Sequence, residues 1–154
     1  MKIGLPLLLS LLLSIESTAQ GPDPKLVDEF GNVHCEGLIG RLDLFLAELS
    51  NSKDGSGLVV LYEGKYINYT SQRSYLVAPV FGEVNIRANL IRNHFKGRGF
   101  DPSRITFASG GFRDEHLVEL WVIPPGGTYP KPKPTRDKIE YRKGKPSTVL
   151  PSCP

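Results

Sequence analysis

The sequence predicts an α+β sandwich in which two helices cover a mixed β-sheet, with the element order β-α-β-α-β-β. Two observations support this prediction. Two segments have apolar residues at helical spacing, and four others have the short apolar or alternating patterns of strands. Hydrophobic residues make up 40% of the 154-residue chain, which is enough for the core of one domain with extensions.

Two amphipathic segments predict the helices. The first is expected from Cys35 to Leu49, and its apolar stripe consists of Leu38, Leu42, Phe45, Leu46 and Leu49. The second has apolar residues at steps of four, three and four, namely Val84, Ala88, Ile91 and Phe95. Pro79 suits the first turn of this helix, and Gly97 and Gly99 can end it by taking positive φ.

Four short segments predict the strands. Lys25–Phe30 is expected at a sheet edge, whereas the continuous apolar run Leu58–Tyr62 is typical of a central strand covered on both faces. Arg104–Ala108 and His116–Ile123 complete the sheet, and Gly110-Gly111 is expected to form the turn between them.

Glu119 lies in the last of these strands and shares a face with apolar residues, namely Leu117, Trp121 and Ile123. Two interpretations remain open at this point. Glu119 lies at a rim of the sheet or pairs with a cation, or else it is an exposed carboxylate on an edge strand, which is the favoured interpretation.

The segment from Glu63 to Ala78 is expected to be a long loop between the second strand and the second helix. It contains one arginine and several tyrosines: Tyr66, Tyr69, Arg73 and Tyr75. These side chains either form the wall of a ligand site or pack the loop against the domain without a ligand. The second interpretation is favoured.

The N-terminal segment has the pattern of a secretory signal peptide, expected over residues 1–19. Lys2 is followed by the apolar run Ile3–Ile15, and Ser17-Thr18-Ala19 places small residues at a cleavage site. Gln20–Pro24 reads as a linker. Because no later segment is apolar enough to cross a membrane, the mature chain is expected to have no transmembrane span.

The C-terminal segment, residues 124–154, is rich in proline and basic residues. It contains eight prolines, seven Lys or Arg and two acidic residues, and therefore has a net charge of +5. Proline-rich composition favours extended chain without regular pairing, so a disordered tail outside the domain of residues 25–123 is expected. The positive charge either keeps this tail solvated or attracts anionic polymers.

The chain has two cysteines, Cys35 and Cys153, and an exported chain meets an oxidising compartment, so one interpretation is a disulfide between them. In the alternative, Cys35 is a buried thiol. No Cys/His cluster has the spacing of a metal site, and no cofactor is implied.

One stretch carries a family resemblance. The pattern R-A-x-x-I-x-x-x-F begins at Arg87, and G-F-D-P-S-R-I follows it and ends at Ile105. The two patterns resemble the second helix and third strand of OmpA-like domains, which bind the peptide of the bacterial cell wall. The flanking segments DEFGNVHCEGLIGRLDLFLAEL and GGFRDEHLVELWVIPPG resemble an OmpA-related domain of exported proteins from soil bacteria. The resemblance covers roughly residues 25–123.

The resemblance implies a ligand site. In the family, an arginine on the second helix and an aspartate after the second strand hold the diamino acid of the wall peptide, and Arg87 matches that arginine. The aspartate has no counterpart, and Glu63 is the nearest carboxylate. We therefore expect ligand binding by Arg87 with help from Glu63 and Arg73. In the alternative, Arg87 is an exposed helix charge paired with Glu83.

The expected function is that of an exported binding module in the periplasm or cell envelope of a bacterium, with peptidoglycan or another envelope component as its partner. The alternative is a protein–protein interaction domain, with an envelope protein as partner, that has lost wall binding. No catalytic motif occurs in the sequence, so catalytic residues are not expected. Nucleic-acid binding is not expected of an exported chain whose basic charge lies in a proline-rich tail.

Overall fold

The computed structural model describes residues 21–69 and 73–146. The predicted signal peptide and Cys153 therefore lie outside the described residues. The elements follow one another in this order: β1 (Lys25–Phe30), α1 (Cys35–Asn51), β2 (Ser56–Tyr69), β3 (Ser74–Val77), α2 (Glu83–Gly97), the short 3-10 helix η1 (Pro102–Arg104), β4 (Ile105–Glu115) and β5 (Leu117–Ile123).

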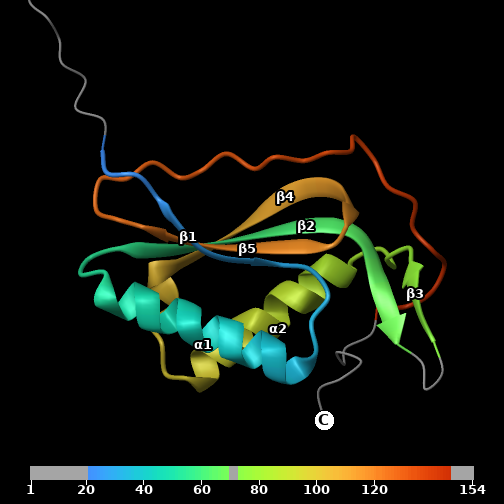
Figure 1. The fold of residues 1–154 in the computed structure, drawn as a ribbon, viewed down its shortest axis with the longest axis horizontal. Helices are drawn as coiled ribbons and strands as arrows, with labels where there is room; N and C mark the ends of the chain where they lie inside the picture. The colour runs from blue at the N-terminus through green and yellow to red at the C-terminus, as the bar shows by residue number, and fades with distance from the viewer. Residues whose placement is uncertain (1–20, 70–72, 147–154) are drawn as a thin grey trace, which may run out of the picture.

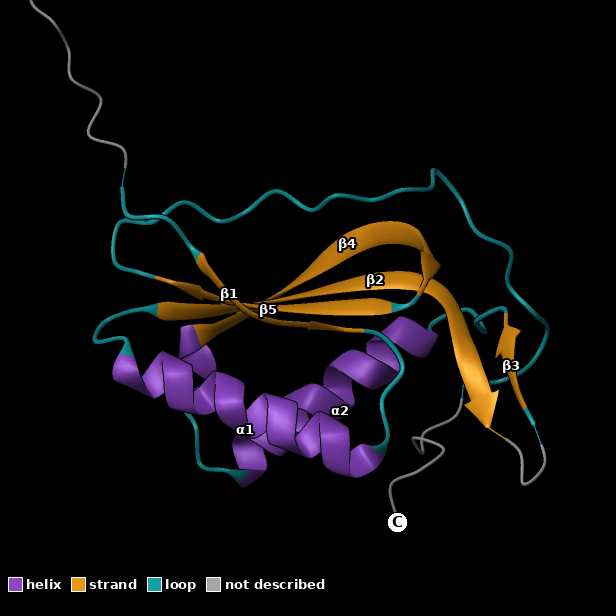
Figure 2. Cartoon of the chain, viewed as in Figure 1, coloured by secondary structure: helices purple, strands orange, loops and turns teal. Residues whose placement is uncertain are grey.

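The central sheet is mixed. β5 pairs antiparallel with β1 on one side and with β2 on the other, and β2 pairs parallel with β4. Both helices lie on the same face of this sheet (Figures 1 and 2). The predicted fold class, an α+β arrangement of two helices on a mixed sheet, is confirmed, although the described chain contains one strand more than expected.

The main core lies between the helices and the sheet, and the predicted apolar stripes build it. Phe45 of α1 and Phe95 of α2 place their ring centroids 5.7 Å apart. They are joined there by buried residues of both helices and of β2 and β5, including Leu42, Leu49, Ala88, Ile91, Val59, Leu61, Val118, Leu120 and Val122. The helical spacing read from the sequence therefore identifies the buried faces correctly.

The expected long loop from Glu63 to Ala78 is instead a β-hairpin. β2 continues to Tyr69, and β3 pairs antiparallel with its last residues. Tyr66 is buried and Tyr75 is exposed, so the tyrosines do not act together as one lid. Tyrosine and β-branched residues favour strands, but polar residues interrupt the run here and mask the strand pattern. Pro79 lies ahead of α2, which begins at Glu83.

The Gly110-Gly111 pair is a bulge within β4 rather than a turn. The register of β4 against β2 shifts between Ser109 and Gly111, and Gly111 has φ of 81°. A Cβ atom at Gly110 would come within 2.4 Å of the Tyr62 ring. Glycine is therefore required here by both backbone conformation and close packing, and the strand continues to Glu115.

The described part of the tail, residues 124–146, first runs along the sheet face opposite the helices and then bends around the end of the sheet toward β3 and the segment that follows it (Figure 1). It contains no regular helix or strand, but successive tail residues contact the chain along β2. Tyr129 bonds the side chain of Ser56 at 3.0 Å, and the backbone N–H of Lys133 donates to the Tyr62 hydroxyl at 3.0 Å. Over these residues the expectation of a disordered spacer is wrong.

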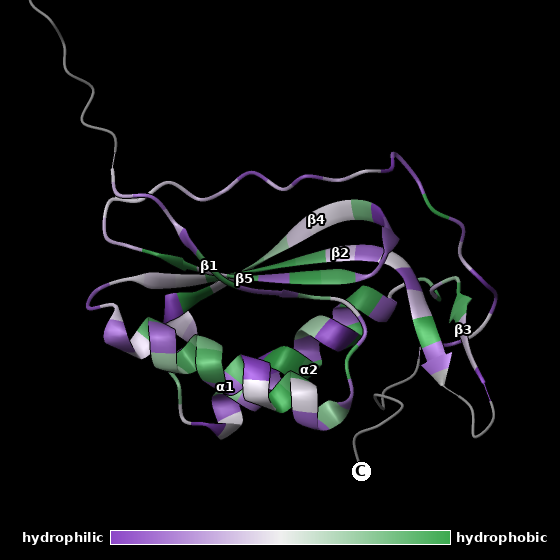
Figure 3. Cartoon of the chain, in the orientation of Figure 1, coloured by the Kyte–Doolittle hydropathy of each residue, from purple (hydrophilic) through white to green (hydrophobic). Residues whose placement is uncertain are grey.

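The reason for this ordered path is the second face of the sheet. It carries a smaller apolar cluster that the helices do not cover, consisting of Leu58, Val60, Tyr62 and Ile123, with Ala108, Leu117 and Trp121 packed against it. β5 and the first half of β2 are mainly hydrophobic, whereas the tail that crosses them is mainly polar (Figure 3). The sequence predicts a central strand that is covered on both faces, and the tail covers part of the second face.

Glu119 belongs to this second face. β5 is an interior strand, so the side chain is buried rather than exposed at an edge. It accepts hydrogen bonds from Arg113 at 3.3 Å and from the Trp121 indole N–H at 3.0 Å. Pairing with a cation is therefore the correct interpretation, since a buried carboxylate is costly without a partner.

Cys35 is disulfide-bonded and is not a free thiol. The alternative of a buried thiol is therefore wrong. The pairing of Cys35 with Cys153 remains a prediction because Cys153 lies outside the described residues.

Candidate functional site

Arg87, the arginine singled out by the family resemblance, is turned into the protein. Its Nη2 atom lies 3.5 Å from a carboxylate oxygen of Glu83, and the two side chains are only 14% and 10% exposed. The guanidinium carbon also lies 5.1 Å from the centre of the Tyr66 ring. Burial lowers the pKa of Arg87, and the Glu83 charge opposes this effect. The pairing with Glu83 is confirmed, but the pair is buried rather than exposed.

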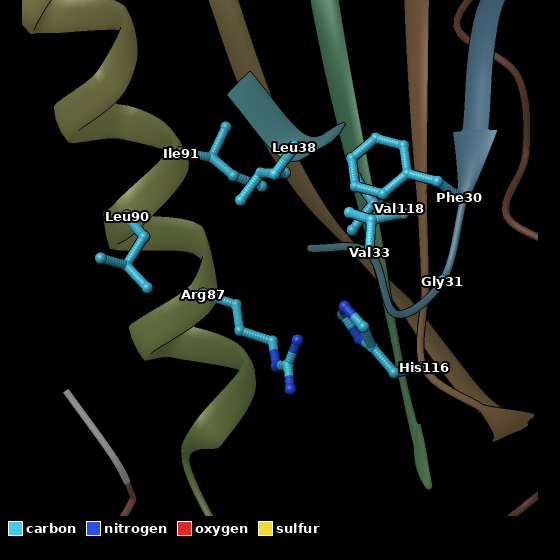
Figure 4. A pocket seen from close by; sticks show the side chains of 9 residues that line it. All are labelled: Phe30, Gly31, Val33, Leu38, Arg87, Leu90, Ile91, His116 and Val118. Atoms are coloured by element: carbon cyan, nitrogen blue, oxygen red, sulfur yellow. The ribbon is translucent and has the colours of Figure 1, made fainter. Parts of the chain in front are cut away.

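Arg87 and His116 face each other across a small cavity of about 30 Å³ (Figure 4). The other lining residues are Phe30, Gly31, Val33, Leu38, Leu90, Ile91 and Val118. A space of this size holds about one water molecule. It is therefore a feature of the interior rather than a site for a substantial ligand.

His116 is held in one neutral form. Its Nδ1 lies 3.0 Å from the Tyr62 carbonyl oxygen, and because a carbonyl only accepts, Nδ1 carries the proton. Burial and the nearby Arg87 charge lower the pKa of His116 from 6.5 to about 3. The protonated form is thus excluded from the folded state near neutral pH.

This histidine should make stability depend on pH. The unfolded state binds a proton near pH 6.5 while the folded state does not, so stabilisation is complete above pH 6.5 and is lost as pH falls. Between pH 7 and pH 5, the free energy of unfolding should fall by about 2 kcal/mol more in wild type than in His116→Gln. Urea unfolding at both pH values measures the difference. Equal losses would show that His116 titrates normally in the folded protein.

A groove lies between α2, β2 and β4 and encloses about 280 Å³. Its apolar lining consists of Leu61, Phe81, Gly82, Val84, Ala88, Phe107 and Ala108, and its polar lining of Glu63, Asn85, Arg92 and Ser109. A carboxylate and a guanidinium therefore line one groove. A volume near 300 Å³ is at the lower end for small-molecule sites.

Glu63 comes from the middle of β2 and is half-buried. Its Oε2 atom accepts a hydrogen bond from the hydroxyl of Tyr141, a tail residue, at 2.8 Å. Burial and this carboxylate raise the pKa of Tyr141 to about 12, so the phenol stays protonated and donates. Within the described residues the other oxygen, Oε1, has no hydrogen-bond partner and remains available to a ligand.

Arg92 comes from α2 and is exposed to solvent. Its guanidinium carbon lies 4.1 Å from the centre of the Phe107 ring, and Nη1 donates to the Asn89 side chain at 3.0 Å. Stacking on an aromatic ring holds the guanidinium in place while its edge stays free for a carboxylate. Sequence reasoning missed Arg92, although its position four residues after Ala88 places both on one helix face.

The three predicted binding residues are only partly brought together. Glu63 and Arg87 line a pocket of about 10 Å³ that also includes Tyr66 and Glu83, which is too small for a ligand. Arg73 immediately precedes β3, at the turn end of the hairpin, and does not line the groove. Of the three predicted binding residues, only Glu63 lines the groove. The arginine that lines it is Arg92.

The comparisons leave the family unassigned. No protein-family model, curated protein or solved structure matches the chain. In residues 21–69 and 73–146, no group of three His, Cys, Asp or Glu side chains could hold a metal ion. No helix in this same part of the chain is long and apolar enough to cross a membrane.

Proposed function

We propose that this protein is an exported, non-enzymatic binding module of the bacterial cell envelope that holds a peptide component of the cell wall in the groove between α2, β2 and β4. The observation that supports this proposal is the presence of Glu63 and Arg92, which have unlike charges, on the walls of one groove. A ligand that bears both an ammonium and a carboxylate fits this arrangement. The signal-peptide pattern at residues 1–19 supports export.

The chemistry of a diamino acid matches the groove. Its ammonium would donate to the free oxygen of Glu63, and its carboxylate would accept from Arg92 through charge-assisted hydrogen bonds. Its aliphatic stem would lie against apolar residues such as Val84 and Ala88. In this proposal Arg87 serves the fold, because Glu83 already occupies the position that a ligand carboxylate would take beside it.

Removing either groove charge should weaken wall binding. A charge-assisted hydrogen bond contributes roughly 1.5–3 kcal/mol, so Glu63→Gln and Arg92→Gln should each lower affinity about tenfold or more. A pull-down on purified peptidoglycan sacculi, followed by titration with soluble wall peptides, measures this loss.

Matched controls separate the groove from total charge. Glu36→Gln and Lys96→Gln remove the same kinds of charge from exposed helix positions that do not line the groove. Both should bind like wild type. Absence of wild-type binding, or equal binding by all four variants, would refute the proposal.

A second candidate function is an interaction with another envelope protein, and exposed apolar side chains favour it. Phe81 is 77% exposed, and Tyr75 and Leu76 of β3 are each 49% exposed. Exposed apolar residues gathered near one edge strand are typical of protein interfaces. Leu76→Asp should abolish such an interaction and leave wall binding unchanged. Glu63→Gln should weaken wall binding and leave the protein interaction unchanged. Co-purification from envelope extracts and the sacculus assay together distinguish the two functions.

A further inference from the structure

A second pocket lies where the tail crosses the end of the sheet, and the tail forms one of its walls. The backbone N–H groups of Thr135 and Arg136 donate to the Phe112 carbonyl at 2.9 and 3.1 Å. Six residues later, the Arg142 N–H donates to the Pro79 carbonyl at 2.9 Å. The tail between these two anchor points, residues 137–141, forms an arch over the space between β4 and the segment after β3.

The pocket under this arch encloses about 300 Å³ and is lined mainly by charged residues. The cations come from three parts of the chain: Lys65 of β2, Arg113 of β4, and Arg136 and Lys138 of the tail. The remaining lining residues are Ala78, Pro79, Asp114, Ile139 and Glu140. Positive charge is thus concentrated in a concave site that shares no lining residue with the groove.

Two of the four cations are already paired, and two are not. Arg136 forms an ion pair with Asp114, and Arg113 bonds the buried Glu119 at 3.3 Å. Lys65 and Lys138 have no side-chain hydrogen-bond or ion-pair partner among the residues that the structure describes.

Arg113 provides an independent sign of an incomplete site. Its Nε atom is buried and, within residues 21–69 and 73–146, has no hydrogen-bond partner. Its guanidinium is held in place because its central carbon lies 4.1 Å from the centre of the Tyr62 ring. A buried donor without a partner is costly, and the contact with the Tyr62 ring fixes this guanidinium at the wall of the pocket.

We propose that this pocket binds a phosphomonoester carried by a group of about the size of one sugar. A phosphomonoester has a charge between about −1.5 and −2 at pH 7 and three acceptor oxygens, which match two ammonium groups and the edge of a guanidinium. A carboxylate offers only two oxygens and one charge. Glu140 accepts the hydroxyls of the sugar, and the pocket volume is suited to a ligand of that size.

The test uses the secreted chain, residues 20–154, and glucose 6-phosphate as the probe in calorimetric titrations at low ionic strength and pH 7.5. Saturable binding is expected for glucose 6-phosphate, weaker binding for inorganic phosphate, and none for glucose. A phosphodiester, which represents the backbone of a phosphate-containing polymer, should bind more weakly than the monoester because it carries one negative charge. Equal affinity for the diester would overturn the assignment of a monoester.

Lys65→Gln and Lys138→Gln should each weaken glucose 6-phosphate binding about tenfold. Lys131→Gln and Lys145→Gln are the matched controls, because they remove a charge from exposed tail positions that do not line the pocket. These controls should change affinity less than about twofold, since exposed charges at a distance are screened by salt. Absence of saturation in wild type, or equal losses in all four variants, would overturn the proposal. The groove variant Arg92→Gln, whose side chain contacts Asn89 and Phe107 rather than any described tail residue, should bind the probe like wild type.

Discussion

Deletion of residues 127–154 is expected to lower the melting temperature by about 10 °C or more. The described tail lies over the sheet face that carries Leu58, Val60 and Tyr62, each no more than 3% exposed in the intact chain. Full exposure of a large apolar side chain costs roughly 1.5–3 kcal/mol, and the deletion also removes the hydrogen bond between Lys133 and Tyr62. A disordered spacer, as expected from composition, would have left stability nearly unchanged.

Thermal unfolding followed by circular dichroism measures this loss. Full-length Cys153→Ser is the control, because it removes a predicted covalent link while keeping the tail. The melting temperature of this variant should lie between those of wild type and the deletion variant. A shift of only a few degrees in the deletion variant would show that the tail lies on the sheet without stabilising it.

Arg87→Ala is expected to destabilise the fold by about 3–5 kcal/mol, because it leaves the buried Glu83 carboxylate without its cation. The variant also removes the stacking of the guanidinium on the Tyr66 ring. The resemblance to OmpA-like domains had suggested a ligand contact here with little effect on folding. Urea unfolding at pH 7 measures the change.

A double variant separates charge from packing. Glu83→Gln/Arg87→Met removes both charges and keeps similar volumes, so it should recover a large part of the stability lost in Arg87→Ala. Arg98→Ala is the surface control, since Arg98 pairs with Asp43 at an exposed position and should cost less than about 1 kcal/mol. Equal losses in Arg87→Ala and Arg98→Ala would show that the buried pair contributes no more than a surface pair.

The periodic part of the fold could be predicted from the sequence. Apolar spacing identified both helices and their buried faces, and β1 was placed at Lys25–Phe30 as observed. The continuous apolar run Leu58–Tyr62 indicated a strand covered on both faces, which the two apolar clusters confirm. These predictions depend on local spacing, and local spacing is what the sequence displays directly.

The remaining features depend on contacts between distant residues. β3 has only four residues, and its pairing with the end of β2 gives no clear apolar pattern. The orientation of Arg87 depends on Glu83 and Tyr66 together, and the path of the tail depends on an uncovered sheet face that spacing alone does not reveal. The role of Arg92 in the groove depends on its contact with Phe107 of β4, which the sequence does not reveal.

The position of the tail also determines when the domain can finish folding. The residues that cross β2 and reach the end of the sheet extend to Arg142, whereas β2 itself ends at Tyr69. The second face of the sheet therefore remains partly uncovered until the chain has been synthesised beyond Arg142, and contacts of such large sequence separation form slowly. Until those residues emerge, the apolar cluster on that face lacks part of its cover, and the tail completes the folded structure of the sheet.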